Sequence, residues 1–117
     1  MSKDKIERVR SSSSGVVGRA QSVARSARLT LDSSSRPQPD ALTNSEAFLA
    51  GISSCGVTLI EMHAQETGIP LRGIHVTIEG VRTAAEPTRF AGMTMTFELA
   101  GVSATQAAEL VETYRGR

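Results

Sequence analysis

The feature that most constrains this chain is a stretch of twenty residues without proline, residues 47–66. Residues 43–45 precede it with the hydroxyl and amide side chains that favour an N-cap, and Glu46 places a negative charge in the first turn. Gly68 and then Pro70 supply a stop signal. These signals predict one helix of about 22 residues.

Apolar side chains occur all around the first four turns of this predicted helix, and polar residues become frequent only from Glu61 onward. A helix that is apolar on every side is buried rather than laid on a surface. We therefore expect a long buried central helix. Small residues surround Cys55, so that other backbones can approach closely there; they are Gly51, Ser53, Ser54 and Gly56.

Alternating apolar and polar residues on both sides of the helix predict strands. Residues 27–32 alternate clearly, and residues 15–19 are a weaker strand candidate. Residues 74–78 and 93–99 alternate as well, and the polar loop between them contains Pro87, so they should form an antiparallel hairpin.

A capping-box pattern at Ser103 and Gln106 begins an amphipathic helix that runs nearly to Arg117. The order of strands, buried helix, hairpin and helix predicts an α+β fold.

The length of 117 residues predicts a single domain, residues 1–117. Residues 1–40 are expected to form a Ser-rich part with N-terminal strands and a linker, and residues 41–117 a helix–hairpin–helix core. The runs Ser11–Ser14 and Ser33–Ser35 are typical of loops and hairpin connections. Prolines at 37 and 39 exclude a central strand or helix interior there.

The chain has no Trp, three Phe and one Tyr, so its core gains little buried area from each side chain. Domains near this length are only marginally stable. The composition therefore favours a second subunit that supplies more buried surface.

The formal net charge of +1 argues against a dedicated nucleic-acid-binding protein, which needs clustered Lys and Arg. The charge is uneven, with +4 over residues 1–40 and −3 over residues 41–117. Apolar runs fall short of 18 residues, and the first ten residues lack an apolar core, so we expect neither a membrane span nor a signal peptide. The expected compartment is the cytoplasm.

Cys55 is the single cysteine, which excludes an intramolecular disulfide, a zinc knuckle and a CxxC redox pair within one chain. A buried structural thiol, a reactive thiol or an intermolecular partner remain open. The two His residues lack metal-site spacing, and we expect neither a metal nor a cofactor. Glu46 lies nine positions before Cys55, about 180° away around a helix, and by itself it is a first-turn acid that serves the helix dipole.

The segment from Thr43 to Cys55, TNSEAFLAGISSC, resembles the central-helix segment of the OsmC/Ohr family of osmotically inducible and organic hydroperoxide resistance proteins. Members of that family open this helix with a Pro-x-Glu-Leu-Leu-like sequence and carry a reactive Cys after an Ala/Gly/Ser-rich turn. The order that follows is also similar, with "ETGIPLRGIHVTIEG", a returning "FAGMTMTFELAGVS" and a helix "ATQAAELVETYR". The resemblance covers residues 41–117 well and the Ser-rich front in outline.

The resemblance implies an intertwined homodimer that acts as a thiol peroxidase on organic hydroperoxides, in defence against oxidative stress. Cys55 matches the peroxidatic nucleophile, and Glu46 matches the acid that orients a thiolate-stabilising Arg. A long guanidinium can bridge an acid and a thiol that do not touch each other. Arg19 follows a glycine, as the family's Arg often does, and is ranked first among five candidates: Arg10, Arg19, Arg25, Arg28 and Arg36.

The family also has a resolving Cys near its C-terminal end, which these 117 residues lack, together with the strand that normally follows the last helix. The resemblance then implies that an external thiol or dithiol reduces the oxidised Cys55. Two alternatives stay open: a non-catalytic OsmC-like module that binds a small apolar molecule, and a truncated, inactive family member.

Overall fold

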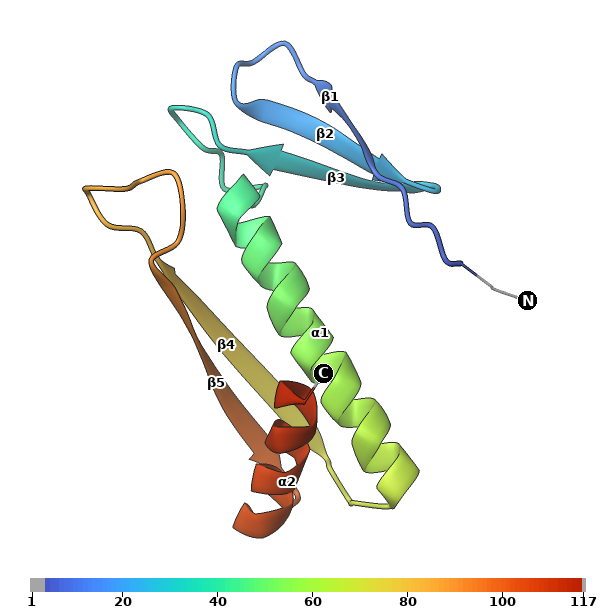
Figure 1. Ribbon diagram of the computed structural model, residues 1–117. Helices are drawn as coiled ribbons and strands as arrows, with labels where there is room; N and C mark the ends of the chain where they lie inside the picture. The colour runs from blue at the N-terminus through green and yellow to red at the C-terminus, as the bar shows by residue number, and fades with distance from the viewer. Residues whose placement is uncertain (1–3, 117) are drawn as a thin grey trace. The chain divides into compact units, whose positions relative to one another are not determined.

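A computed structural model describes residues 4–116, and its elements follow the predicted α+β order (Figure 1). The chain divides into two compact units, of which the first ends at Phe48 and the second begins at Leu49. Each unit is described by itself.

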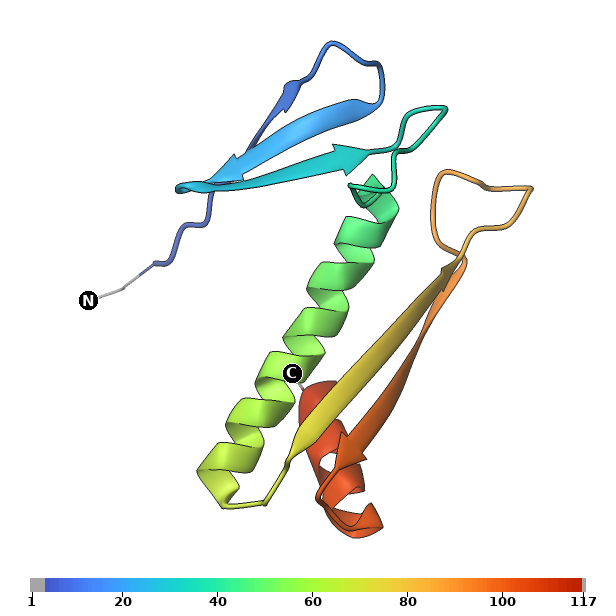
Figure 2. The same ribbon diagram turned by 180° about the vertical axis from the view of Figure 1, so that it is seen from behind.

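The first unit holds a three-stranded antiparallel sheet in the order β1-β2-β3. Its strands are β1 (Arg10–Ser13), β2 (Arg19–Ala24) and β3 (Ala27–Asp32), and β2 lies in the middle in both views (Figures 1 and 2). The predicted strand at residues 27–32 is confirmed. The weaker candidate at residues 15–19 is wrong, because this segment is a turn and the strand begins only at Arg19.

Strand β1 corrects a second expectation, because the Ser run that we assigned to a loop forms part of it. Ser11 lies opposite Ser22 on β2, and the two hydroxyl oxygens are 2.7 Å apart. A strand at a sheet edge is held by its backbone ladder, so small polar side chains are compatible with it even without an alternating pattern.

Two turns of this sheet contain a residue with a positive φ angle, a backbone conformation that most residues disfavour. Gly18 has φ +92°, and a Cβ there would lie 2.7 Å from the Cα of Ser34, so the position requires glycine. Arg25 has φ +58° at the first central position of the β2–β3 turn, where glycine is preferred. A non-glycine residue in this conformation costs roughly 1–2 kcal/mol.

The long helix is α1 (Asn44–Thr67), 24 residues that begin and end where the sequence predicts. At its C-terminal end Gly68 has φ +73°, and the Ile69 N–H donates to the Ala64 carbonyl at 3.0 Å, as in a Schellman motif. The turn satisfies a terminal carbonyl and redirects the chain.

The second unit contains the predicted hairpin, β4 (Gly73–Val81) and β5 (Gly92–Ala100), with nine residue pairs in antiparallel register. Helix α2 (Ala104–Arg115) follows it. The predicted capping box is confirmed, because the Ser103 hydroxyl accepts from the Gln106 N–H and the Gln106 side chain accepts from the Ser103 N–H.

The core of this unit lies between α1, the hairpin and α2. Three apolar side chains there are buried: Ile60 and Ala64 of α1, and Leu110 of α2. Partly buried side chains from the hairpin and from α2 pack around them, among them Phe97 and Tyr114, whose ring centroids are 5.7 Å apart.

The second unit by itself does not bury α1 on every side. Its buried residues are Gly56, Ile60 and Ala64, which share one face, while Phe48 and Met62 are about half exposed. One hairpin and one short helix cover a single side of a helix, so the second unit by itself leaves the remaining apolar surface of α1 uncovered.

Candidate functional site

Cys55 lies near the middle of α1, and its side chain is exposed in the single chain. The residue after it, Gly56, is buried instead, and a Cβ at Gly56 would be 3.5 Å from side-chain atoms of Met95 and Tyr114. The helix therefore turns Gly56 toward the core of the second unit and Cys55 away from that core. A thiol buried and inert within the chain, one of the open readings, is not what the structure contains.

Glu46 lies in the first turn of α1 and closes a capping box there. The Thr43 N–H donates to Oε1 of Glu46 at 2.9 Å, and the Glu46 N–H donates to Oγ1 of Thr43 at 3.1 Å. Two backbone donors at the helix start are thereby satisfied, and the carboxylate also lies at the positive end of the helix dipole. Glu46 has the structural role of a first-turn acid.

Arg19 opens β2 and binds two carboxylates. Its Nη1 donates to Oδ2 of Asp32 at 2.8 Å, and its Nη2 donates to Oδ2 of Asp40 at 3.1 Å. Arg19 and Asp32 are direct neighbours across the β2–β3 ladder, so the register of the sheet forms the inner pair. The two hydrogen-bonded carboxylates raise the pKa of Arg19, Asp40 more than Asp32, and keep its charge fixed.

Asp32 is the most buried charged residue of the first unit, with 1% of its surface exposed. Its carboxylate accepts four hydrogen bonds, from the Ser34 N–H and hydroxyl, the Gln38 N–H and the Arg19 guanidinium. The Ser34 hydroxyl first, and then the backbone donors of Gln38 and Ser34, hold the pKa of Asp32 far below its usual range. Asp32 thus holds both the segment that follows β3 and the guanidinium group of Arg19.

The Asp40 carboxylate differs from Asp32 because 67% of its side chain is exposed. Solvent screens an ion pair of this kind, so it contributes little to stability. Arg19 therefore has one buried carboxylate partner and one exposed carboxylate partner.

The structure brings only some of the predicted residues together. Arg19 and Glu46 both lie in the first unit, where no ion pair joins them, and Cys55 belongs to the second unit. Among residues 4–116, Arg19 makes ion pairs, and the other four candidate arginines, Arg10, Arg25, Arg28 and Arg36, make none.

Sequence reasoning missed Asp32 and Asp40 as partners of Arg19. The alternation over residues 27–32 grouped Asp32 with the polar side chains of the strand, whereas the structure buries Asp32 and leaves Leu29 about half exposed. Gly18, just before Arg19, lies so close to the backbone of Ser34 that a Cβ there would collide with it, and no local pattern links positions 18 and 34. Asp40 followed two prolines in a segment assigned to a connection.

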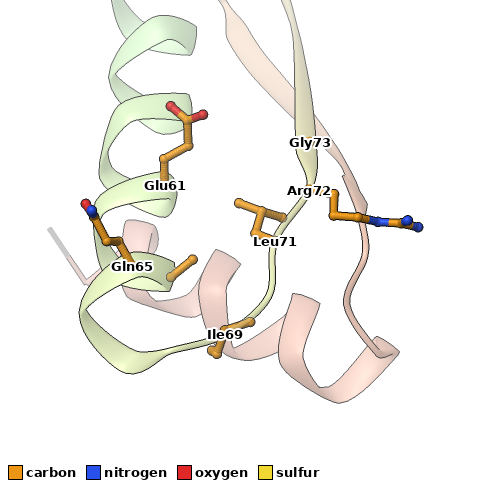
Figure 3. A pocket seen from close by; sticks show the side chains of 7 residues that line it. Glu61, Gln65, Ile69, Leu71, Arg72 and Gly73 are labelled. Atoms are coloured by element: carbon orange, nitrogen blue, oxygen red, sulfur yellow. The ribbon is translucent and has the colours of Figure 1, made fainter.

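A pocket of about 260 Å³ lies in the second unit, at the C-terminal end of α1 (Figure 3). Leu71 points from the segment before β4 toward α1, whereas the Arg72 side chain extends away from the helix. Glu61 lies six positions after Cys55 on α1, and the thiol does not line this pocket. The lining residues are Glu61, Ala64, Gln65, Ile69, Leu71, Arg72 and Gly73.

Comparison with protein families defines the class of protein that carries this fold. A family model described as OsmC-like protein matches residues 37–116, which is more than half of the chain. The chain belongs to the OsmC-like family. No curated protein sequence matches it.

Solved structures share the fold at low sequence identity. A crystal structure of an OsmC-like protein from Mycoplasma pneumoniae is 18% identical with a TM-score of 0.83, and the match covers 98% of this chain and 84% of that chain. An organic hydroperoxide resistance protein OsmC from Legionella pneumophila is 18% identical with a TM-score of 0.73 and coverages of 98% and 85%. The organic hydroperoxide resistance protein OhrB of Bacillus subtilis is 15% identical with a TM-score of 0.63 and coverages of 96% and 84%.

The family also clarifies helix α1, which is long and apolar enough to cross a membrane by length and composition. By itself this property does not indicate a membrane span, because the core helix of a soluble protein passes the same criterion. Within the chain, 17% of the most apolar part of α1 is buried. Because the match to the Mycoplasma pneumoniae structure extends over nearly the whole chain, α1 included, we interpret α1 as the central helix of the OsmC-like fold.

Proposed function

We propose that this protein is a thiol peroxidase that reduces organic hydroperoxides at Cys55. The observation that carries the proposal is the exposed thiol of Cys55 in the middle of α1, in a chain of the OsmC-like family. Two structural neighbours whose names refer to organic hydroperoxide resistance support the choice of substrate.

The reaction needs only the thiol and two substrates. The Cys55 thiolate attacks one oxygen of the hydroperoxide, a sulfur–oxygen bond forms as the oxygen–oxygen bond breaks, and the leaving alkoxide takes a proton to become an alcohol. Cys55 is then a sulfenic acid. One external thiol condenses with it to a mixed disulfide and releases water, and a second thiol restores Cys55 and leaves as a disulfide.

Arg19 and Glu46 enter the proposal through the family resemblance. A guanidinium beside Cys55 would stabilise the thiolate, since a residue this far along a helix gains little from the helix dipole. Arg19 can exchange its screened pair with Asp40 for another anion while Asp32 continues to hold it. Glu46 offers the carboxylate that would orient the guanidinium, and its capping-box contact uses Oε1.

We further propose a homodimer in the cytoplasm. Exposed apolar side chains on α1 and the small core of the second unit both favour a covering partner. The opposite net charges of residues 1–40 and 41–117 favour contact between the front of one copy and the back of another. Sedimentation velocity tests this point, and a monomer at micromolar concentration would contradict it.

Peroxide consumption tests the activity. Purified protein with dithiothreitol or dihydrolipoamide as reductant should consume cumene hydroperoxide, and dimedone should trap the sulfenic acid at Cys55. Cys55→Ser should abolish both signals, whereas Ser54→Ala, a matched change at the neighbouring exposed position, should preserve them. Equal consumption by the wild-type protein and Cys55→Ser would overturn the proposal.

A further inference from the structure

Asp32 is a buried charged residue to which the proposed reaction assigns no part. Only 1% of its surface is exposed, and among residues 4–116 it is the one charged residue that is buried. A buried carboxylate loses its hydration, so it is compatible with a fold only where hydrogen bonds and a cation replace the water. The cation here is Arg19, whose Nη1 lies 2.8 Å from Oδ2 of Asp32. Asp32 therefore holds the arginine that is ranked first for the stabilisation of Cys55.

The Asp32 carboxylate is anchored by donors other than Arg19. Its Oδ1 accepts from the Ser34 N–H at 3.0 Å and from the Ser34 hydroxyl at 2.5 Å, and its Oδ2 accepts from the Gln38 N–H at 3.0 Å. The backbone N–H of Asp32 donates to the Leu42 carbonyl at 2.8 Å. Because these bonds fix the carboxylate independently of the arginine, Asp32 can orient Arg19 rather than follow it.

The second carboxylate on Arg19 is not anchored in this way. Oδ2 of Asp40 accepts from Nη2 of Arg19 at 3.1 Å, but 67% of the Asp40 side chain is exposed, so water and salt weaken this pair. An arginine side chain has several rotatable bonds, and its guanidinium is restricted to one orientation where a fixed acceptor holds it. Of the two carboxylates, Asp32 is the one that can fix that orientation.

The anchors of Asp32 all lie in residues 33–43, the segment that leads into α1. In the first turn of α1, the Asn44 N–H donates to the hydroxyl oxygen of Ser33 at 2.8 Å. Hydrogen bonds along this segment thus join Asp32 to the start of the helix that carries Cys55. A change at Asp32 can therefore act through Arg19 or through the start of α1, and a double variant separates the two.

We propose that Asp32 is a positioning residue for hydroperoxide reduction, which holds the guanidinium of Arg19 in the orientation that stabilises the Cys55 thiolate. This role rests on the proposed function, in which Arg19 provides the cation. A carboxylate beside a guanidinium has two opposite effects on a thiolate, because it fixes the place of the cation and also offsets its charge. In this protein the first effect exceeds the second.

Asp32→Asn tests which effect dominates. An amide has one acceptor oxygen, so either the donors on Oδ1 or those on Oδ2 lose their acceptor. The kcat/KM for cumene hydroperoxide should fall by about tenfold or more, since small displacements of a positioned group have effects of this size. The pH at which alkylation of Cys55 by iodoacetamide is half-maximal should rise by roughly 1 pH unit. A midpoint that falls would show that Asp32 only offsets the charge of Arg19.

Asp40→Asn is the matched control, because it removes the same charge from the same guanidinium and leaves the buried anchor in place. It should not raise the alkylation midpoint. A rise equal to that of Asp32→Asn would contradict the distinction between the two carboxylates.

Ser34→Ala keeps the charge of Asp32 and removes one of its anchors, so it decides the question if Asp32→Asn does not fold. Its alkylation midpoint should rise as in Asp32→Asn but by less, whereas Ser35→Ala, a change at the neighbouring exposed serine, should leave the midpoint unchanged. Far-UV circular dichroism and the urea midpoint identify the variants that are folded. Unchanged alkylation and kcat/KM in every folded variant of Asp32 and Ser34 would overturn the proposal.

Variants of Arg19 separate failure of this proposal from failure of the proposed function. If Asp32 acts through Arg19, then Arg19→Ala/Asp32→Asn should be no slower than Arg19→Ala, whereas a further loss in the double variant would assign the effect to the start of α1. If Arg19→Ala leaves the midpoint unchanged while Cys55 still reduces hydroperoxide, the role of Asp32 is overturned and the reaction stands. Equal consumption by the wild-type protein and Cys55→Ser would overturn the reaction, and the role of Asp32 with it.

Discussion

The start of helix α1 yields the sharpest prediction, because the side chains of Thr43 and Glu46 each accept a hydrogen bond from the backbone N–H of the other residue. Loss of an N-cap side chain costs about 1 kcal/mol of folding free energy. Thr43→Ala should therefore destabilise the protein by about 1 kcal/mol, and Glu46→Ala by a similar amount, since it loses both the 2.9 Å contact and the favourable charge at the helix start.

Glu46→Gln separates the structural role of this residue from a catalytic one. An amide oxygen can still accept from the Thr43 N–H, because Gln serves at this position of a capping box. Only the charge is lost, which costs about 0.3–1 kcal/mol at an exposed helix end. If Glu46 also orients the thiolate-stabilising arginine, then Glu46→Gln should slow hydroperoxide reduction far more than this small loss of stability explains.

Urea denaturation at one fixed protein concentration measures the stability part, because an oligomer makes the midpoint depend on concentration. With a slope of about 1.5 kcal/mol per molar urea, a loss of 1 kcal/mol lowers the midpoint by roughly 0.7 M. The double variant Thr43→Ala/Glu46→Ala should lose less than the sum of the single variants, by about 0.5 kcal/mol or more. Strictly additive losses would show that the two hydrogen bonds of this capping box form independently of each other.

Three further predictions follow from the same structure. Gly18→Ala should destabilise the protein by about 2 kcal/mol or more, because φ is +92° and the new Cβ would meet the backbone at Ser34. Gly56→Ala should leave stability unchanged or raise it, because its Cβ would make ordinary contacts and Ala has the better helix propensity. Thermal melts of the two variants compare these effects. Leu110→Ala should cost about 2–5 kcal/mol in chemical denaturation, as a fully buried side chain of a small core, and a loss below 1 kcal/mol would contradict that packing. The lowered pKa of Asp32 predicts that its contribution to the free energy of unfolding is complete above about pH 5 and is lost as the pH falls below about 4 toward the folded-state pKa. Asp32→Asn should therefore make the free energy of unfolding depend less on pH in the acid range. An unchanged pH dependence there would show that other carboxylates control it.

Much of the architecture was accessible from the sequence because local signals and tertiary packing agree. The helix caps at Thr43 and Ser103 bind as their residue types predict, and the alternation over residues 74–78 and 93–99 matches the two strands of the hairpin. Strand β1 was missed because a Ser run carries no periodicity, and the ladder to β2 that defines it is a long-range contact.

Of the candidate site, the sequence by itself determined which thiol is available as a nucleophile, since the chain holds one cysteine, and which segment resembles a known family. The tertiary structure decided which residues surround Cys55 and Arg19. The packing of Gly56 against Met95 and Tyr114 turns Cys55 outward, and the ladder between β2 and β3 brings Arg19 to Asp32. Local patterns report which face of a helix or strand a residue occupies, whereas exposure and ion pairing depend on elements distant in sequence that come together only when the chain folds.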